Sequence, residues 1–246
     1  LMEFKGHTQK LTFANYTPDG KTIISASNDG TAKIWNTDGK CLATAKGHTA
    51  GILYLAISPK GNLFATTSYD KTSRIWDLNG NCLQVLKGHE ETVRWIFFSN
   101  DGKKLITNSE DKTARVWNLS GECIKIFQNP SVVTIAKFSP DGQKIATLSD
   151  DYVIRVWNIN GRAEDKLIGH TSNIHYIDFS PDGKYLISTS GDNTAFLWNL
   201  DVHEKQILGG YTGYVFFTQI SPDGNYILPF SNDGNAGLWN RKGIFQ

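Results

Sequence analysis

The sequence has little net charge and no long apolar run. Its 25 Lys and Arg residues nearly balance 24 Asp and Glu residues, which leaves a net charge of +1 without a basic block. Nucleic acids and anionic membranes bind concentrated positive charge, so we expect neither as a partner. No apolar run approaches the roughly 18 residues of a membrane span.

Cysteine is also scarce, since the chain has only Cys41, Cys82 and Cys123, spaced 41 residues apart. Zinc sites of the C-x2-C kind need a spacing that is absent here. A disulfide needs Cα atoms about 5.5 Å apart, which we do not expect between successive repeats. We interpret the cysteines as free thiols duplicated with a repeat. We therefore expect no metal, no cofactor and a reducing, cytoplasmic compartment.

What is present is a unit that recurs along the whole chain. Residues 169–200, GHTSNIHYIDFSPDGKYLISTSGDNTAFLWNL, show it most clearly, with Gly-His followed by three short apolar runs and tight turns. Short strands joined by such turns form an antiparallel meander. A tryptophan ends each third run, at steps of 41, 41, 40, 41 and 41 residues: Trp35, Trp76, Trp117, Trp157, Trp198 and Trp239. A period of roughly 40–45 residues indicates propeller blades.

These motifs resemble the WD-repeat (WD40) family over nearly all of residues 1–246. They are Gly6-His7, Gly47-His48, Gly88-His89 and Gly169-His170, with repeat ends such as Trp76-Asp77. The style of the repeats looks most like long bacterial, particularly cyanobacterial, proteins. The resemblance implies an all-β propeller of six four-stranded antiparallel blades. The alternative is part of a seven-bladed or longer repeat array.

We expect one propeller domain over residues 1–246. The repeats are placed at about 6–46, 47–87, 88–127, 128–168, 169–209 and 210–246. Residues 1–5 match the outer-strand segments 42–46 and 83–87, so we expect them to form an outer strand that closes the ring. Closure would leave no free sheet edge. Outer-strand sequence at both ends also fits an excerpt from a longer array.

By the resemblance, each blade carries a structural tetrad of His, Ser or Thr, Asp and Trp. A buried indole N–H needs an acceptor, a hydroxyl can accept it and donate onward to His, and His can donate to a carboxylate. The four complete sets are His7, Ser25, Asp29 and Trp35; His48, Thr66, Asp70 and Trp76; His89, Thr107, Asp111 and Trp117; and His170, Ser188, Asp192 and Trp198. A catalytic Ser-His-Asp site occurs once, in a cleft. Four periodic copies therefore indicate blade stability, and we expect no catalytic residue.

Two units depart from this pattern. The fourth has Asn129 in place of His, and the sixth has Tyr211 in place of His and Pro229 in place of the hydroxyl. Because proline cannot donate to a sheet ladder, we expect the sixth blade to be the least regular. Drift, softness at a closing seam and reshaping for a ligand all remain open explanations.

Three positions of each unit project, by the resemblance, to the ring face that binds partners in the family. Aromatic residues and arginine dominate binding hot spots. This selects the candidate partner-binding residues Leu53, Tyr69, Arg94, Tyr214 and Phe216. Aromatics also fill a neighbouring position in five of the six units, where we expect heavier packing near the ring axis: Phe13, Tyr54, Trp95, Tyr176 and Phe217.

The sequence thus predicts a non-enzymatic scaffold that binds a protein or peptide. We expect it to be the sensing or scaffolding module of a larger bacterial signalling protein. One alternative is a structural, self-assembling repeat array. Another is a propeller enzyme acting at the ring axis, but no Walker A, kinase or protease motif is present.

Overall fold

The computed structural model describes residues 3–246, and all regular secondary structure in that range is β-strand. The chain forms two compact units, Leu1–Ala136 and Lys137–Gln246, whose boundary falls within strand β13. The described residues contain no helix with the length and hydropathy needed to cross a membrane.

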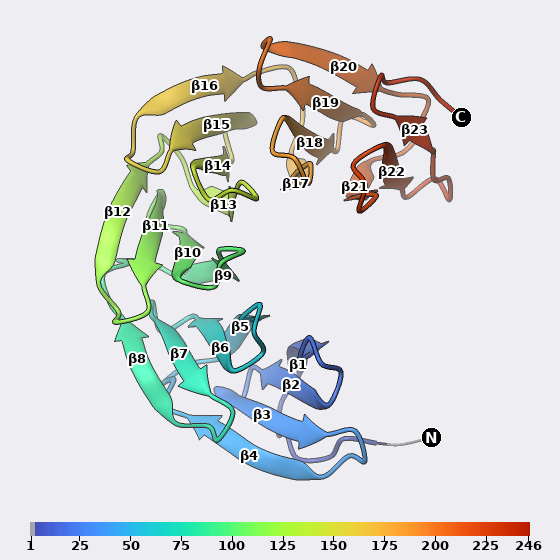
Figure 1. Cartoon of the computed structure of the whole chain (residues 1–246). Coiled ribbons are helices and arrows are strands. Elements are labelled where there is room, and N and C mark those ends of the chain that lie inside the picture. The colour runs from blue at the N-terminus through green and yellow to red at the C-terminus, as the bar shows by residue number, and fades with distance from the viewer. Residues whose placement is uncertain (1–2) are drawn as a thin grey trace. The chain divides into compact units, whose positions relative to one another are not determined.

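The N-terminal unit contains three four-stranded antiparallel sheets, each in chain order (Figure 1). Their first strands lie on one side of the unit and their last strands on the other. The strands are β1 (Leu11–Tyr16), β2 (Thr22–Ser27), β3 (Thr31–Asn36), β4 (Cys41–Lys46), β5 (Ile52–Ile57), β6 (Leu63–Ser68), β7 (Ser73–Asp77), β8 (Cys82–Leu86), β9 (Val93–Phe98), β10 (Lys104–Ser109), β11 (Thr113–Asn118) and β12 (Cys123–Gln128).

The C-terminal unit continues the same pattern, with two four-stranded sheets and a last sheet of three strands. The strands are β13 (Val133–Phe138), β14 (Lys144–Ser149), β15 (Val153–Asn158), β16 (Ala163–Leu167), β17 (Ile174–Phe179), β18 (Tyr185–Ser190), β19 (Ala195–Asn199), β20 (Glu204–Leu208), β21 (Val215–Ile220), β22 (Tyr226–Ser231) and β23 (Trp239–Asn240). The predicted all-β architecture of six sheets is confirmed, with the sixth sheet partial.

The turn between the first and second strands of each sheet follows from its sequence. Between β17 and β18, the Ser180 hydroxyl donates to Asp182 at 2.6 Å, and the Gly183 amide donates to the Ser180 carbonyl at 2.8 Å. Gly183 has φ of +71°, a conformation that favours glycine. A Pro-Asp-Gly sequence therefore reverses the chain there.

Neighbouring sheets within a unit pack face to face. In the N-terminal unit, Ile24 and Ile34 of the first sheet lie in one fully buried cluster with Leu55 and Phe64 of the second. In the C-terminal unit, Leu197 of the fifth sheet packs in the same way with residues of the sixth. The repeat therefore produces a series of similar apolar seams, whose burial stabilises each unit.

The two ends of the chain bear on ring closure. Residues 1 and 2 lie outside the described residues, and residues 3–5 belong to no strand. At the other end, Phe245 forms an antiparallel bridge with Trp239, as Cys41 pairs with Trp35 in the first sheet. The C-terminal tail thus begins an outer strand, and closure by residues 1–5 stays a prediction.

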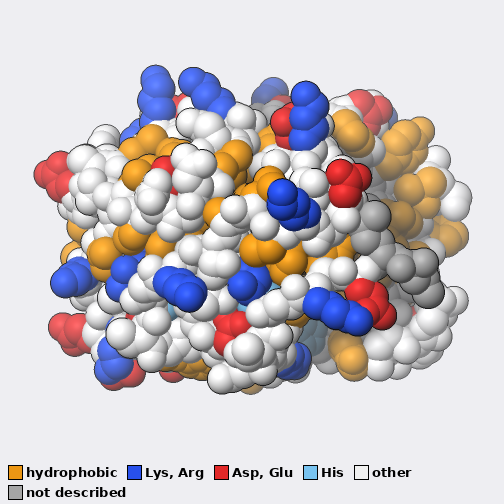
Figure 2. Space-filling model, turned by 90° about the horizontal axis from the view of Figure 1, so that it is seen from below, with side chains coloured by type: hydrophobic (Ala, Val, Ile, Leu, Met, Phe, Trp, Pro, Cys, Tyr) orange, Lys and Arg blue, Asp and Glu red, His pale blue; other side chains and the backbone are white. Residues whose placement is uncertain are grey.

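Charges of both signs are mixed on the surface. On the face seen in Figure 2, Lys and Arg side chains lie among Asp and Glu side chains. Cys41 and Cys82 carry exposed free thiols, and the free thiol of Cys123 is partly buried.

Candidate functional site

The structure brings each predicted tetrad together. In the third sheet, the Trp117 indole N–H donates to the Thr107 hydroxyl at 2.8 Å, and this oxygen lies 2.7 Å from His89 Nε2. His89 Nδ1 lies 2.7 Å from Asp111 Oδ2. The other carboxylate oxygen of Asp111 accepts the hydroxyl proton of Thr113 at 2.7 Å. The network thus ties the opening loop of the repeat to the second and third strands of the sheet.

The same contacts, at 2.7–2.9 Å, occur in the first, second and fifth sheets. The sets that they join are His7, Ser25, Asp29 and Trp35; His48, Thr66, Asp70 and Trp76; and His170, Ser188, Asp192 and Trp198. In every set the Ser or Thr hydroxyl already accepts an indole N–H and contacts a histidine. This geometry suits a structural role inside each sheet. The stabilising role of the tetrads stays a prediction.

Two of the predicted site residues, Thr66 and Ser188, lie where no ligand can reach them. Both are completely buried, as is the neighbouring Trp76. The Thr66 hydroxyl accepts the Trp76 indole N–H at 2.8 Å, and the Ser188 hydroxyl accepts the Trp198 indole N–H at 2.8 Å. Thr66 and Ser188 therefore do not belong to a binding or catalytic surface, and they can act only inside their blades.

Burial and hydrogen bonding set the charges of these groups. Burial alone would raise the pKa of Asp111, but hydrogen bonds from His89 and Thr113 outweigh it and hold that pKa well below its usual range. Burial lowers the pKa of His89 and of His170 despite their carboxylate partners. These two imidazoles are therefore neutral at pH 7, with one ring nitrogen donating and the other accepting.

The fourth sheet, which lacks the histidine, uses an arginine instead. Arg155 Nη1 and Nη2 donate to the two oxygens of Asp151 at 3.1 and 2.5 Å, and Nη1 also donates to the Ser149 hydroxyl at 2.8 Å. The Trp157 indole still donates to Thr147 at 2.9 Å. Arg155 thus takes over the task of holding the turn carboxylate.

The sixth sheet has a different hydrogen-bond network, which is centred on a tyrosine. The Trp239 indole donates to the Tyr211 hydroxyl at 3.2 Å, so Tyr211 replaces the hydroxyl that Pro229 cannot supply. A backbone hydrogen bond from Thr212 contributes most to lowering the pKa of Asp233 to about 2. Sequence reasoning identified both departures but neither replacement.

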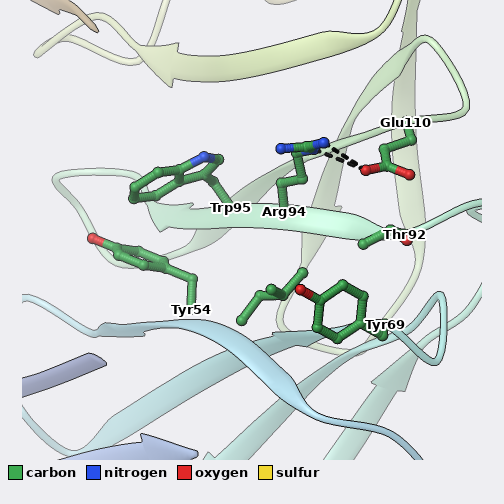
Figure 3. Close-up of a pocket in the computed structure, with 7 residues that line it drawn as sticks. Tyr54, Tyr69, Thr92, Arg94, Trp95 and Glu110 are labelled. Atoms are coloured by element: carbon green, nitrogen blue, oxygen red, sulfur yellow. Dashed lines mark hydrogen bonds and ion pairs between the residues drawn. The ribbon is translucent and has the colours of Figure 1, made fainter. Parts of the chain in front are cut away.

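A cavity of about 220 Å³ opens at the seam between the second and third sheets of the N-terminal unit (Figure 3). We call it the seam pocket. Its lining is Leu53, Tyr54, Tyr69, Thr92, Arg94, Trp95 and Glu110. Strands β5 and β9 supply four of these residues, and the turns after β6 and β10 supply two more. Three of the five predicted partner-binding residues, Leu53, Tyr69 and Arg94, therefore share one cavity.

The seam pocket combines aromatic walls with an ion pair. Arg94 Nε and Nη2 donate to one oxygen of Glu110 at 3.1 and 2.6 Å. The Tyr54 ring packs 4.5 Å from that of Trp95 and 4.3 Å from that of Phe13, measured between centroids. Burial raises the pKa of Tyr54 to about 12, so its phenol stays neutral. These contacts fix one wall, while the Tyr69 side chain remains 54% exposed.

The first seam of the same unit shows why the cavity opens at the second. A Cβ on Gly51 would lie 3.1 Å from Asn28 Cα, closer than an ordinary contact, so a larger residue would push these loops apart. Thr92 and Tyr69 occupy the equivalent positions at the second seam. Larger side chains at both positions leave no room for such an approach, and the cavity lies there.

The other two candidates, Tyr214 and Phe216, form a separate cluster in the C-terminal unit. Their ring centroids lie 6.3 Å apart, and Tyr214 also packs edge-on against His175 at 5.6 Å. Both side chains are nearly half exposed. This cluster is aromatic and lacks an ion pair such as Arg94–Glu110 among its described contacts.

Sequence reasoning did not select Glu110, Thr92, Tyr54 or Trp95 as partner-binding residues. Glu110 had one available signal, because it and Arg94 carry opposite charges at two projecting positions of the same repeat. The aromatics were expected near the ring axis, and the structure shows that Tyr54 and Trp95 also line the seam pocket.

Comparison with known proteins agrees with this architecture. A family model described as the first β-propeller of IFT122 matches residues 10–245, nearly the whole chain. A search of curated proteins found no match. The bacterial style of the repeats stays a prediction. The repeated antiparallel sheets and this match show that the chain belongs to the WD-repeat β-propeller family.

Proposed function

We propose that this chain is a non-enzymatic scaffold that binds a protein or peptide at the seam pocket. WD-repeat propellers are typical mediators of protein interactions. The observation that carries the proposal is the convergence of Leu53, Tyr69 and Arg94 on one cavity. Half-exposed Tyr and Arg side chains beside a fixed aromatic wall are the residue types that dominate binding energy.

The size of the seam pocket supports a macromolecular partner. Small-molecule sites usually enclose roughly 300–1,000 Å³. At about 220 Å³, this pocket suits one side chain or chain end, with the rest of the partner lying over the surrounding loops. The internally bonded Ser-His-Asp sets offer no free nucleophile and support a non-enzymatic role.

We further propose that the scaffold serves as the sensing or scaffolding module of a larger bacterial signalling protein in the cytoplasm. The free thiols and the mixed surface charge support this setting. A self-assembling array is the second candidate. It is supported by the first sheet, where Leu11 is 51% exposed although its repeat equivalents Ile52 and Val93 are fully buried.

The test is affinity capture from the source-cell lysate with three forms of the full chain. One is the parent, one carries Tyr69→Ala and Arg94→Ala, and the matched control carries Tyr214→Ala and Phe216→Ala. All three should melt at the same temperature. We expect a protein that the parent and the control retain and the first variant loses. Equal capture by all three would contradict the seam-pocket site, and concentration-dependent oligomers of the parent without a partner would favour the array.

A further inference from the structure

We propose that the seam pocket recognises a carboxylate of the partner peptide, which binds the free edge of the Arg94 guanidinium. This inference rests on the proposed function, because it specifies the chemistry of the partner at the same site. It follows from which hydrogen-bonding groups in the pocket are already used and which are not.

Only one edge of the Arg94 guanidinium is hydrogen-bonded. Nε and Nη2 form one edge of its planar fork, and both donate to the same oxygen of Glu110. Among the described residues, Nη1 has no hydrogen-bond partner. The second edge, made of Nη1 and the remaining N–H of Nη2, is therefore open, and a carboxylate can accept from both nitrogens at once.

Five further side-chain groups around the cavity lack a hydrogen-bond partner within residues 3–246. The indole N–H of Trp95 can only donate, the hydroxyls of Tyr54, Tyr69 and Thr92 can donate or accept, and Oε2 of Glu110 can only accept. In Figure 3 the Arg94 guanidinium lies between Glu110 and the Trp95 indole, and the Tyr69 hydroxyl points toward the middle of the lining residues. All of these groups except Glu110 Oε2 can donate, as can the open edge of Arg94, so an acceptor-rich guest fits them best.

Charge and packing favour the same guest. An ammonium or guanidinium guest would add donors and be repelled by Arg94, while the carboxylate that could attract it, Glu110, is already paired with Arg94. A carboxylate guest instead gains a two-point, charge-assisted contact, while its methylene groups pack against Leu53 and Trp95. The apolar wall excludes water from one side of the ion pair between the guest carboxylate and Arg94 and so strengthens that pair. Glu110 acts as a positioning residue, because its contact with Nε and Nη2 fixes the plane of the guanidinium.

The carboxylate can come from an Asp or Glu side chain or from a peptide C-terminus. The test is a titration of the 15N-labelled full chain with three probes. N-acetylglutamate α-amide carries a side-chain carboxylate, N-acetylleucine carries a terminal one, and N-acetylglutamine α-amide is the neutral isostere. The chain has seven tryptophans, and six of them, the repeat tryptophans, occupy the same position in each repeat, so Trp95→Phe assigns the signal of the seventh, Trp95.

We expect at least one carboxylate probe to shift the Trp95 signal saturably, with at least tenfold tighter binding than the neutral amide. The probe that binds more tightly identifies the source of the carboxylate. Arg94→Lys keeps the charge but removes the fork, and should weaken binding at least tenfold. The exposed Arg162→Lys is the matched control and should leave binding unchanged. Unshifted signals of the repeat tryptophans confirm the fold.

Equal binding of the neutral amide, equal binding by Arg94→Lys, or no shift with any probe would overturn the carboxylate assignment. If those results came with partner capture that still depends on Tyr69 and Arg94, the scaffold function would stand and only the ligand chemistry would fail. Carboxylate binding as expected, with partner capture unaffected by the Tyr69 and Arg94 substitutions, would instead contradict the scaffold site.

Discussion

Arg155 shows how one residue can take the place of another of different chemistry. In the fourth repeat Asn129 occupies the histidine position, and its side-chain amide donates to the neighbouring Phe127 carbonyl at 3.1 Å. Arg155, two residues before Trp157, instead donates hydrogen bonds to Asp151 from two nitrogens. Its side chain is 10% exposed. Hydrogen bonds from Arg155 and Ser149 outweigh the effect of burial and lower the pKa of Asp151.

We predict that Arg155→Ala lowers the free energy of unfolding by about 2–4 kcal/mol, because it leaves a partly buried carboxylate without its cation. Arg74→Ala is the matched control, since Arg74 occupies the same repeat position while His48 holds Asp70 at 2.7 Å. It should cost about 1 kcal/mol or less. Urea unfolding of the full chain measures both. Equal losses in the two variants would show that Arg155 has no special role.

The sequence could not predict this replacement. Periodicity identifies which positions repeat, and it correctly located His89, Thr107 and Trp117 for one hydrogen-bonded set. It does not say which long side chain reaches a vacant position. The Arg94–Glu110 pair was missed for the same reason, because Arg94 on β9 and Glu110 in the turn after β10 occupy positions that vary between repeats.

At the scale of the element, the six sheets could be predicted because each repeat carries the same apolar runs and a turn that ends in glycine, which is Pro-Asp-Gly in four of the six. The exceptions are local. Pro229 lies in β22, and the strand that follows, β23, is only Trp239–Asn240. The seam pocket could not be predicted, because it depends on how closely two loops approach at Gly51 and at Thr92.

Residues at equivalent positions of two strands can also differ in burial. Leu11 of β1 and Ile52 of β5 occupy the same repeat position, yet they are 51% and 0% exposed. We predict that Ile52→Ala costs about 2–5 kcal/mol, whereas Leu11→Ala costs about 1 kcal/mol or less, because only the first leaves a cavity. Chemical unfolding of the two variants compares them. Equal costs would mean that another surface covers β1 in solution.

At the scale of the whole molecule, the repeated tetrads should make stability fall in acid. Hydrogen bonding holds the pKa values of Asp29, Asp70 and Asp111 below the usual range, although burial opposes this. These carboxylates stabilise the native state above their unfolded pKa of about 3.9, and the contribution is lost as the pH falls further. Buried His89 and His170 act in the same direction, because the unfolded chain binds their protons first, from about pH 6.5 downward.

We therefore expect the urea midpoint to be level from about pH 9 to 7, to fall below about 6.5 and to fall more steeply below about 4. A series of unfolding curves at fixed ionic strength measures it. His89→Gln should reduce the fall of the midpoint between about pH 6.5 and 4, because it removes one of the two imidazoles whose pKa burial lowers. A midpoint that stays level or rises on acidification to pH 5 would be at odds with neutral buried histidines.

The central claim is that a partner protein binds at the seam pocket of this propeller. The most direct measurement is site-specific photo-crosslinking in the source-cell lysate, with a photoreactive amino acid in place of Tyr69. The control replaces Leu83 on β8, which is similarly exposed at 46%. We predict a defined crosslinked partner from position 69 that is absent from position 83 and is lost with Arg94→Ala. The same partner crosslinked equally from both positions, or from position 83 alone, would contradict the account.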